Sequence, residues 1–175
     1  VTLLREAREA YDVMGAAESN DFEVLVAYAD LLVEQGDHDL AEKALLRAVD
    51  VDRESAQAWL KLGQTESRLG PRSETRAILS LRQAAAIEPK SEATVQACAS
   101  LGALYQQAGL YDFARETYAK ALEQDPNHVG SKLAIAALDA RDGDMVKANK
   151  AYGEVEKNSA DYGGFIQNTL SIALQ

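Results

Sequence analysis

The side chains able to do chemistry in this chain are few, and their spacing does not fit a catalytic or metal-binding site. The two histidines, His38 and His128, both fall at predicted turns between helices, where we expect solvated side chains rather than a general base or a metal ligand. Asp37 and Asp39 flank His38 and could hold a stray metal ion, but three adjacent residues cannot close a coordination shell.

Three aspartates surround Gly143 without forming a calcium-binding pattern. Asp139, Asp142 and Asp144 lack the ligand spacing of a calcium loop, so we interpret them as helix-capping residues. The single cysteine, Cys98, excludes an internal disulfide and a cysteine-rich zinc site, and its place in the repeat described below predicts a buried, unreactive thiol. The sequence therefore predicts no enzyme, no cofactor and no metal site.

The composition excludes several classes of partner. The 175 residues carry 18 Lys and Arg against 28 Asp and Glu, a formal charge of −10. Phosphate binding needs clustered cations, so nucleic acids and anionic membrane surfaces are poor partners. No window reaches the roughly 18 consecutive apolar residues of a membrane-spanning helix. A single cysteine fits either the cytoplasm or the periplasm, so the compartment stays open, with the cytoplasm favoured.

A repeating pattern of helical hairpins runs along the whole chain. Alanine and leucine are frequent, apolar residues recur at spacings of three and four, and a glycine-containing turn divides each copy into two helices. Copies begin at residues 22, 56, 95 and 129 and a fifth would begin at 163, so the intervals are 34, 39, 34 and 34 residues. The frame is fullest in copy three, which contains Cys98, Leu101, Gly102, Tyr105, Gly109, Ala114, Tyr118, Ala121 and Pro126.

This frame resembles the tetratricopeptide repeat (TPR) family, whose motif W-x2-L-G-x2-Y, A-x3-F, P recurs about every 34 residues. The resemblance covers essentially the whole chain and implies an all-α fold class, a right-handed α-solenoid of TPR helix-turn-helix repeats. The implied organisation is a single TPR domain over 1–175, with a half repeat at 1–21, repeats at 22–55, 56–94, 95–128 and 129–162, and a terminal helix at 163–175.

Four residues depart from the family pattern. Glu66 stands at the tyrosine position of copy two, Arg53 replaces the proline of copy one, and copy four has Lys132 and Asp139 at normally apolar places. Both ends of the chain cut through the pattern, because the first 17 residues match only a second helix and residues 165–175 only a first helix. We therefore infer an excised portion of a longer protein, with a natural C-terminal capping helix as the alternative.

The longer interval between copies two and three predicts two local insertions. Two extra residues lengthen the hairpin turn at Gly70-Pro71-Arg72, and three more after Pro89 add almost a turn to the next helix, which Ser91 starts. Two further local expectations come from the pattern. Asp39, with Glu42 three residues later, resembles a capping pair at the second helix of copy one. Trp59 takes the place in copy two that Cys98 takes in copy three, so we expect it in the core.

The resemblance also implies a binding face, since first helices line a concave groove in this family. Carried over residue by residue, the family positions predict a peptide-binding groove. Glu23 and Glu34 join Asp30 at the copy-one end, which predicts a Lys or Arg in the ligand. The predicted groove residues are Val26, Asp30, Gln57, Leu60, Gln64, Arg68, Gln96, Ala99, Ala103, Gln106, Leu133, Ala137 and Arg141.

The chemistry of this face favours a peptide ligand. Family members that bind a C-terminal carboxylate use Lys, Arg and Asn at groove places held here by Val26, Asp30, Gln64 and Ala99, so that clamp is absent. Glutamine amides suit a peptide backbone, and small alanines leave room for a helix or a bulky apolar side chain. We predict a non-catalytic protein-interaction scaffold that binds an extended or helical segment with apolar anchors and a basic residue.

Other interpretations stay open. The glutamines could simply solvate a scaffold surface, the chain could self-assemble end to end through apolar faces of its terminal helices, or it could be a regulatory arm of a larger protein. Arg68, Arg72, Arg76 and Arg82 cluster around the longer turn. We interpret them as a solvated face that balances nearby acids, with carboxylate or phosphate binding as the alternative.

Overall fold

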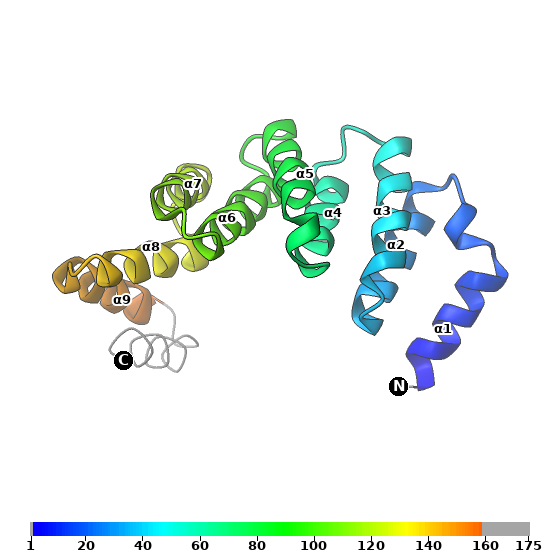
Figure 1. The fold of residues 1–175 in the computed structure, drawn as a ribbon, viewed down its shortest axis with the longest axis horizontal. Helices are drawn as coiled ribbons and strands as arrows, with labels where there is room; N and C mark the ends of the chain where they lie inside the picture. Colours follow the sequence, from blue (N-terminus) through cyan, green and yellow to red (C-terminus); the bar gives the residue numbers. More distant parts are fainter. Residues whose placement is uncertain (1, 159–175) are drawn as a thin grey trace. The chain divides into compact units, whose positions relative to one another are not determined.

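The computed structural model describes residues 2–158, which are helical apart from short turns and loops (Figure 1). No strand occurs in this range, in agreement with the predicted all-α fold. The terminal helix predicted at 163–175 lies outside the described residues. The elements are α1 Thr2–Val13, η1 Ala16–Glu18, α2 Phe22–Gln35, α3 His38–Val51, α4 Ala56–Arg68, η2 Pro71–Ser73, α5 Glu74–Ile87, α6 Glu92–Gln107, α7 Tyr111–Gln124, α8 Val129–Arg141 and α9 Met145–Asn158.

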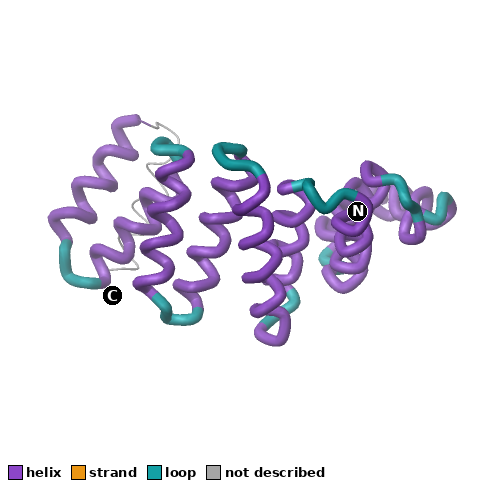
Figure 2. The backbone as a smooth tube through the Cα atoms, turned by 90° about the horizontal axis from the view of Figure 1, so that it is seen from above, coloured by secondary structure: helices purple, strands orange, loops and turns teal. Residues whose placement is uncertain are grey.

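Consecutive helices pair as hairpins joined by short loops, as Figure 2 shows. Contacts join α2 to α3, α4 to α5 and α8 to α9. Helices α2, α4 and α8 begin at Phe22, Ala56 and Val129, where the sequence placed the starts of three copies. The chain divides into two compact units, of which the first ends at Ser100 and the second begins at Leu101, so α6 contributes to both.

Short polar side chains fix the helix starts. The Asp21 carboxylate accepts the backbone N–H groups of Glu23 and Val24 at 3.0 and 3.2 Å, which satisfies two free donors in the first turn of α2. Ser91 Oγ accepts the backbone N–H of Thr94 at 3.1 Å and thereby caps α6. At 16 residues α6 is longer than the 13-residue α4, as the inserted residues predicted.

The capping pair predicted at α3 is wrong. This helix begins at His38 with Asp37 at its N-cap, so Asp39 already lies inside the first turn. The Glu42 side chain is buried instead of reaching back to the helix start. Its Oε1 lies 2.5 Å from Nη1 of Arg76 on α5. The Glu42 side chain forms an ion pair with the next repeat and is therefore not placed to accept the backbone N–H at the helix start.

The core of the first unit is made mainly of Ala and Leu side chains from α2, α3 and α4. Gly63 brings α4 close to α5, because a Cβ at this position would lie only 2.6 Å from Cγ of Leu81. Trp59 packs against the core half-buried, and its indole N–H donates to the Arg53 carbonyl at 2.9 Å. The buried cluster consists of Ala16, Tyr28, Ala29, Leu32, Ala41, Ala44, Leu45, Val49, Ala58 and Leu62.

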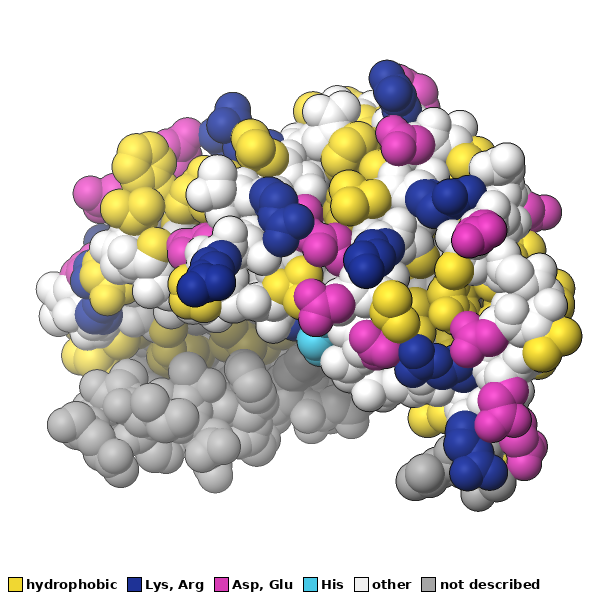
Figure 3. Space-filling model, turned by 45° about the vertical axis from the view of Figure 1, so that its right-hand side comes forward, with side chains coloured by type: hydrophobic (Ala, Val, Ile, Leu, Met, Phe, Trp, Pro, Cys, Tyr) yellow, Lys and Arg dark blue, Asp and Glu magenta, His cyan; other side chains and the backbone are white. Residues whose placement is uncertain are grey.

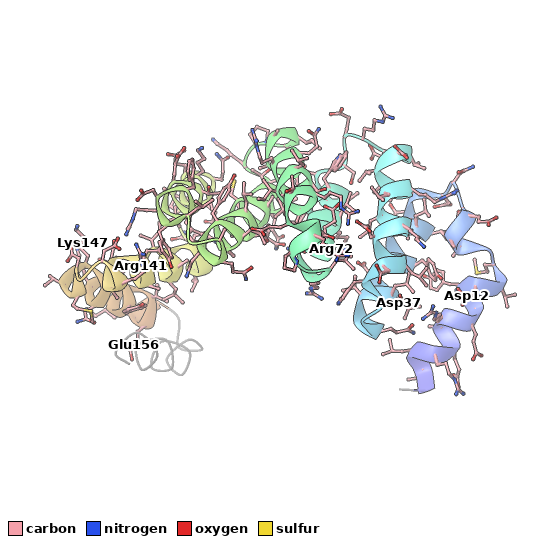
Figure 4. The ribbon with its side chains drawn as sticks, in the orientation of Figure 1. Asp12, Asp37, Arg72, Arg141, Lys147 and Glu156 are labelled. Atoms are coloured by element: carbon pink, nitrogen blue, oxygen red, sulfur yellow. The ribbon has the colours of Figure 1, made fainter. Side chains whose placement is uncertain are left out.

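Polar contacts attach α1 to the first full hairpin. Arg8 lies between two carboxylates, with Nη2 3.1 Å from Asp37 and Nε 3.7 Å from Asp12. Asp12 and Asp37 are labelled in Figure 4 on α1 and on the turn before α3. The Tyr28 hydroxyl donates to Asp12 at 2.7 Å, and burial together with this contact raises the pKa of Tyr28. The half repeat is therefore fixed by directional contacts as well as by apolar packing.

The second unit uses larger aromatic residues where the first uses leucine. A Cβ on Gly102 of α6 would lie 2.7 Å from the ring of Tyr118 on α7, so this helix pair also meets at a glycine. Burial raises the pKa of Tyr118 to about 12. Tyr152 of α9 packs with Ala136 of α8 in a further buried cluster. Each hairpin thus buries its own small-residue stripe against a large side chain.

Candidate peptide-binding groove

The predicted groove residues divide between the two units. The first unit contains Val26 and Asp30 on α2, the α4 residues, and Gln96 and Ala99 on α6. The second contains the remaining α6 residues and those on α8. Each set is therefore described within its own unit. The α4 residues are Gln57, Leu60, Gln64 and Arg68, and those of the second unit are Ala103, Gln106, Leu133, Ala137 and Arg141.

A pocket opens between α2 and α4 in the first unit, and we call it the α2–α4 pocket. It encloses about 180 Å³. Three predicted groove residues, Asp30, Gln64 and Arg68, come together in its wall. The complete lining is Asp30, Val33, Leu45, Lys61, Gln64, Thr65 and Arg68.

The ion pair in this pocket was not predicted from the sequence. Lys61 Nζ lies 2.5 Å from Asp30 Oδ1, and the two side chains are 25% and 50% exposed. The family positions missed Lys61 and Thr65. Helical spacing is the signal that could have found them, because Lys61 and Arg68 each lie three or four residues from both Gln64 and Thr65, so the four residues share one face of α4.

The amide of Gln64 is only weakly engaged inside the protein. Its Nε2 lies 3.4 Å from Ser100 Oγ, a long distance for a hydrogen bond, and its side chain is half-buried. Arg68 is exposed and forms no ion pair with any residue between 2 and 158. The α2–α4 pocket therefore carries polar groups with unused hydrogen-bonding capacity.

Two predicted groove residues offer almost no surface to a ligand. Leu60 is 1% exposed and Leu133 is 5% exposed, so both side chains belong to the packed core. On α4, the family groove position held by Leu60 therefore faces the core and not the surface. By contrast, Gln57 is exposed, and Val26, Gln96, Ala99 and Ala137 are half-buried.

In the second unit the predicted polar groups already have partners. Gln106 Oε1 accepts the Tyr118 hydroxyl at 3.1 Å. The Arg141 guanidinium lies 3.4 Å from the centre of the Tyr111 ring, a cation–π distance, and its Nη2 lies 2.6 Å from Asp142. Arg141 also lines a shallow hollow with residues 109–113. These contacts fix the side chains in place and leave less capacity for a ligand than the α2–α4 pocket has.

The arginine patch separates into different environments. Arg76 is held by Glu42, and its Nη2 also donates to Ser73 Oγ at 2.7 Å. Arg68 lines the α2–α4 pocket. Arg72, labelled in Figure 4, and Arg82 are exposed and form no ion pair within the described range. On the face drawn in Figure 3, basic and acidic side chains are interspersed rather than segregated by sign.

The histidines differ from the predicted solvated turn residues. His128 is the N-cap of α8, where its Nδ1 accepts the backbone N–H of Ser131 at 3.2 Å. His38 starts α3, and its buried Nδ1 has no hydrogen-bond partner among residues 2–158. Both side chains are half-buried, because the ends of tightly packed helices enclose the residues that start them. The predicted burial of Cys98 is confirmed.

Buried carboxyl groups are the remaining titratable candidates. Glu66 is 2% exposed and accepts the Ser80 hydroxyl at 2.7 Å. Burial is the main cause that raises its pKa, and the charge of Glu42 acts in the same direction. Across residues 2–158, no three His, Cys, Asp or Glu side chains gather closely enough to hold a metal ion. None of the helices in this range is long and apolar enough to cross a membrane.

Two family models described as tetratricopeptide repeat match the chain, one over residues 22–65 and the other over residues 95–128. Tetratricopeptide repeat protein 37 of Xenopus laevis is 29% identical over 158 residues, which cover 89% of this chain and 10% of that protein. The chain spans about a tenth of the length of the curated relatives it matches.

Solved structures share the architecture. The crystal structure of MamA matches with a TM-score of 0.77 and 25% identity, over 91% of this chain and 92% of that one. YrrB, a TPR protein with an unusual peptide-binding site, matches with a TM-score of 0.68 and 19% identity, over 99% of this chain and 82% of that one, which shows the fold alone. The fold points to a protein–protein interaction scaffold. Both family models begin where the sequence placed the start of a copy, at 22 and 95, so the predicted resemblance to the tetratricopeptide repeat family is confirmed.

Proposed function

We propose that this chain is a non-catalytic interaction module that binds an extended or helical peptide segment along the first helices of its repeats. The α2–α4 pocket is the observation that carries the proposal, because Asp30, Gln64 and Arg68 meet there from two repeats. At about 180 Å³ the pocket is smaller than the roughly 300–1,000 Å³ typical of small-molecule sites. Its size suits one side chain of a longer ligand.

The polar groups of the pocket support a peptide rather than an apolar ligand. The Gln64 amide can both donate and accept, as a peptide backbone requires, and its contact with Ser100 is weak enough to exchange. Val33 supplies apolar surface beside these groups. An apolar wall with a few oriented polar groups is the usual composition of a specific binding site.

A random dodecapeptide display library panned on the chain tests this proposal. The blocking variant is Gln64→Trp, whose ring would fill the α2–α4 pocket. The matched control is Leu79→Trp, which places the same ring at an exposed position on α5. We expect selected peptides to bind wild type and Leu79→Trp alike and to lose at least about tenfold in affinity with Gln64→Trp. Peptides that bind all three proteins equally would contradict the proposed site.

Self-association is a second candidate, favoured by one observation. Leu3, Val13 and Met14 on or just after α1 are large apolar side chains with most of their surface exposed. Uncovered apolar surface of this kind marks interfaces. Sedimentation over a hundredfold range of concentration measures it, and a constant monomer mass would exclude this candidate.

A further inference from the structure

The charges in the α2–α4 pocket have the opposite sign to the one expected from the sequence. The predicted groove residues included Asp30 but omitted Lys61. With Lys61 and Arg68 in the wall, two cationic side chains face one anionic side chain. The pocket is therefore net positive in a chain whose formal charge is −10.

Asp30 forms an ion pair with Lys61, and a ligand carboxylate could take the place of Asp30 in this contact. The two side chains are 2.5 Å apart, but Asp30 is half exposed, and exposed ion pairs contribute little net stability. A carboxylate on a ligand would offer Lys61 the same charge and geometry. Asp30 is thus an internal competitor for the group that the ligand would use.

Arg68 and Gln64 supply donors beside Lys61. Arg68 has no ion pair with a residue between 2 and 158, and its planar guanidinium can bind both oxygens of a carboxylate. The Gln64 amide lies in the same wall and can donate a further hydrogen bond. Leu45 and Thr65 also line the pocket and are buried, and reduced solvent access strengthens charge interactions.

We propose that the α2–α4 pocket binds the side-chain carboxylate of an Asp or Glu in a partner protein segment. Arg68 and Lys61 hold its two oxygens, Gln64 donates a hydrogen bond, and Asp30 is displaced from Lys61. This inference rests on the proposed peptide-binding function and reverses the basic ligand residue that the sequence predicted.

Three peptide libraries of identical design test the sign of the preferred residue. Each is a nonapeptide array with four random positions on either side of a fixed Glu, Gln or Lys. We expect the Glu array to bind the wild-type chain about tenfold more tightly than the Lys array, with the Gln array between them. Binding to the Glu array should weaken as salt rises.

Single variants assign the effect to the pocket. Arg68→Gln and Lys61→Gln should each abolish the preference for Glu, whereas Asp30→Asn should strengthen binding to the Glu array about threefold because the competitor is gone. Arg82→Gln is the matched control, since Arg82 is an exposed arginine on α5 with no ion pair among residues 2–158, and it should leave all three arrays unchanged.

The outcomes separate this inference from the proposed function. Equal binding to the three arrays, or tighter binding of Lys peptides, overturns the carboxylate site and leaves a peptide groove in place. Weaker binding of Glu peptides by Asp30→Asn also overturns it. A failure of all arrays to bind overturns both proposals.

Discussion

Repeats two and four each carry an acid at the same place in the first helix, and the two acids are accommodated by opposite means. Glu66 follows Gly63 by three residues, is buried, and accepts a neutral hydroxyl from Ser80. Asp139 follows Ala136 by three residues and pairs with the guanidinium of Arg115 on α7. At Glu66, burial raises the pKa and so favours the uncharged carboxyl group. At Asp139, a nearby cation balances the charge of the carboxylate.

The difference lies in what the neighbouring helices place opposite each acid. Arg76 is close enough to lower the pKa of Glu66, but its direct partner is Glu42, so burial wins and the pKa rises. Arg115 binds both Asp139 and Asp142, and these contacts raise its own pKa although burial opposes its charge. The position of an acidic residue within a repeat therefore does not determine how its charge is accommodated, because its partner lies on another helix.

The largest effect should come from Arg76→Leu, which removes the cation that pairs with Glu42 and also acts on Glu66. Glu42 would remain buried without a counter-charge, so we expect the free energy of unfolding to fall by about 2–3 kcal/mol. Chemical denaturation followed by circular dichroism measures this change. Arg72→Leu removes an exposed arginine four residues earlier that forms no ion pair within the described part of the chain, and it should change the free energy by less than about 0.5 kcal/mol. Equal effects of the two variants would show that Arg76 is not holding Glu42.

A smaller loss should follow from Arg115→Leu in the second unit. Asp139 and Asp142 would lose their shared partner, and because these groups are partly exposed we expect about 1–2 kcal/mol of destabilisation. The double variant Arg115→Leu/Asp139→Leu should recover part of this loss, since it restores the apolar residue typical of the family. A double-mutant cycle with no coupling between the two positions would refute the ion-pair account.

The smallest effect, and the sharpest contrast, should come from Glu66→Gln. Because burial raises the pKa of Glu66, the folded chain binds a proton more tightly than the unfolded chain. This stabilisation is present below the unfolded pKa of about 4.3 and is lost as pH rises through the folded pKa. Glu66→Gln keeps an acceptor for Ser80 without the charge, so its free energy of unfolding should exceed that of wild type by about 1 kcal/mol or less near pH 7.

The same comparison across pH checks the sign. The stability difference between Glu66→Gln and wild type should widen from about pH 4 to pH 7 in thermal or chemical melts. Asp139→Asn is the natural contrast, because this substitution removes the charge that Arg115 needs and should destabilise the chain at pH 7. A stability difference for Glu66→Gln that narrows as pH rises would contradict the raised pKa.

The helical hairpins were predictable because they depend on local periodicity. Phe22, Ala56 and Val129 start helices as the repeat frame indicated, and Ser91 caps the lengthened α6. The two close approaches at Gly63 and Gly102 also follow from the motif, since each glycine faces a large residue of the partner helix. These features need only contacts within one hairpin, which the sequence encodes at short range.

The candidate site was less predictable because its chemistry depends on pairs from different repeats. Asp30 on α2 was assigned an attractive role for a basic ligand, yet Lys61 on α4 is its partner. Likewise, nothing in the spacing of Glu42 indicated Arg76 of α5 as its partner. Leu60 occupies a family groove position but is buried. Side-chain pairing across repeats and the depth of each residue are properties of the packed array.

The position of α6 across both units limits where the protein can be divided into folded fragments. The boundary between the two compact units falls between Ser100 and Leu101, in the middle of an unbroken helix. A fragment cut at that boundary would lose the backbone hydrogen bonds that cross it and expose the ends of two half-helices. Fusion junctions and protease sites belong instead in the turns before Glu92 or after Gln107, where they leave the helix intact. Because the two units share α6, neither unit can be moved complete into another protein unless α6 goes with it, and the other unit then lacks its part of that helix.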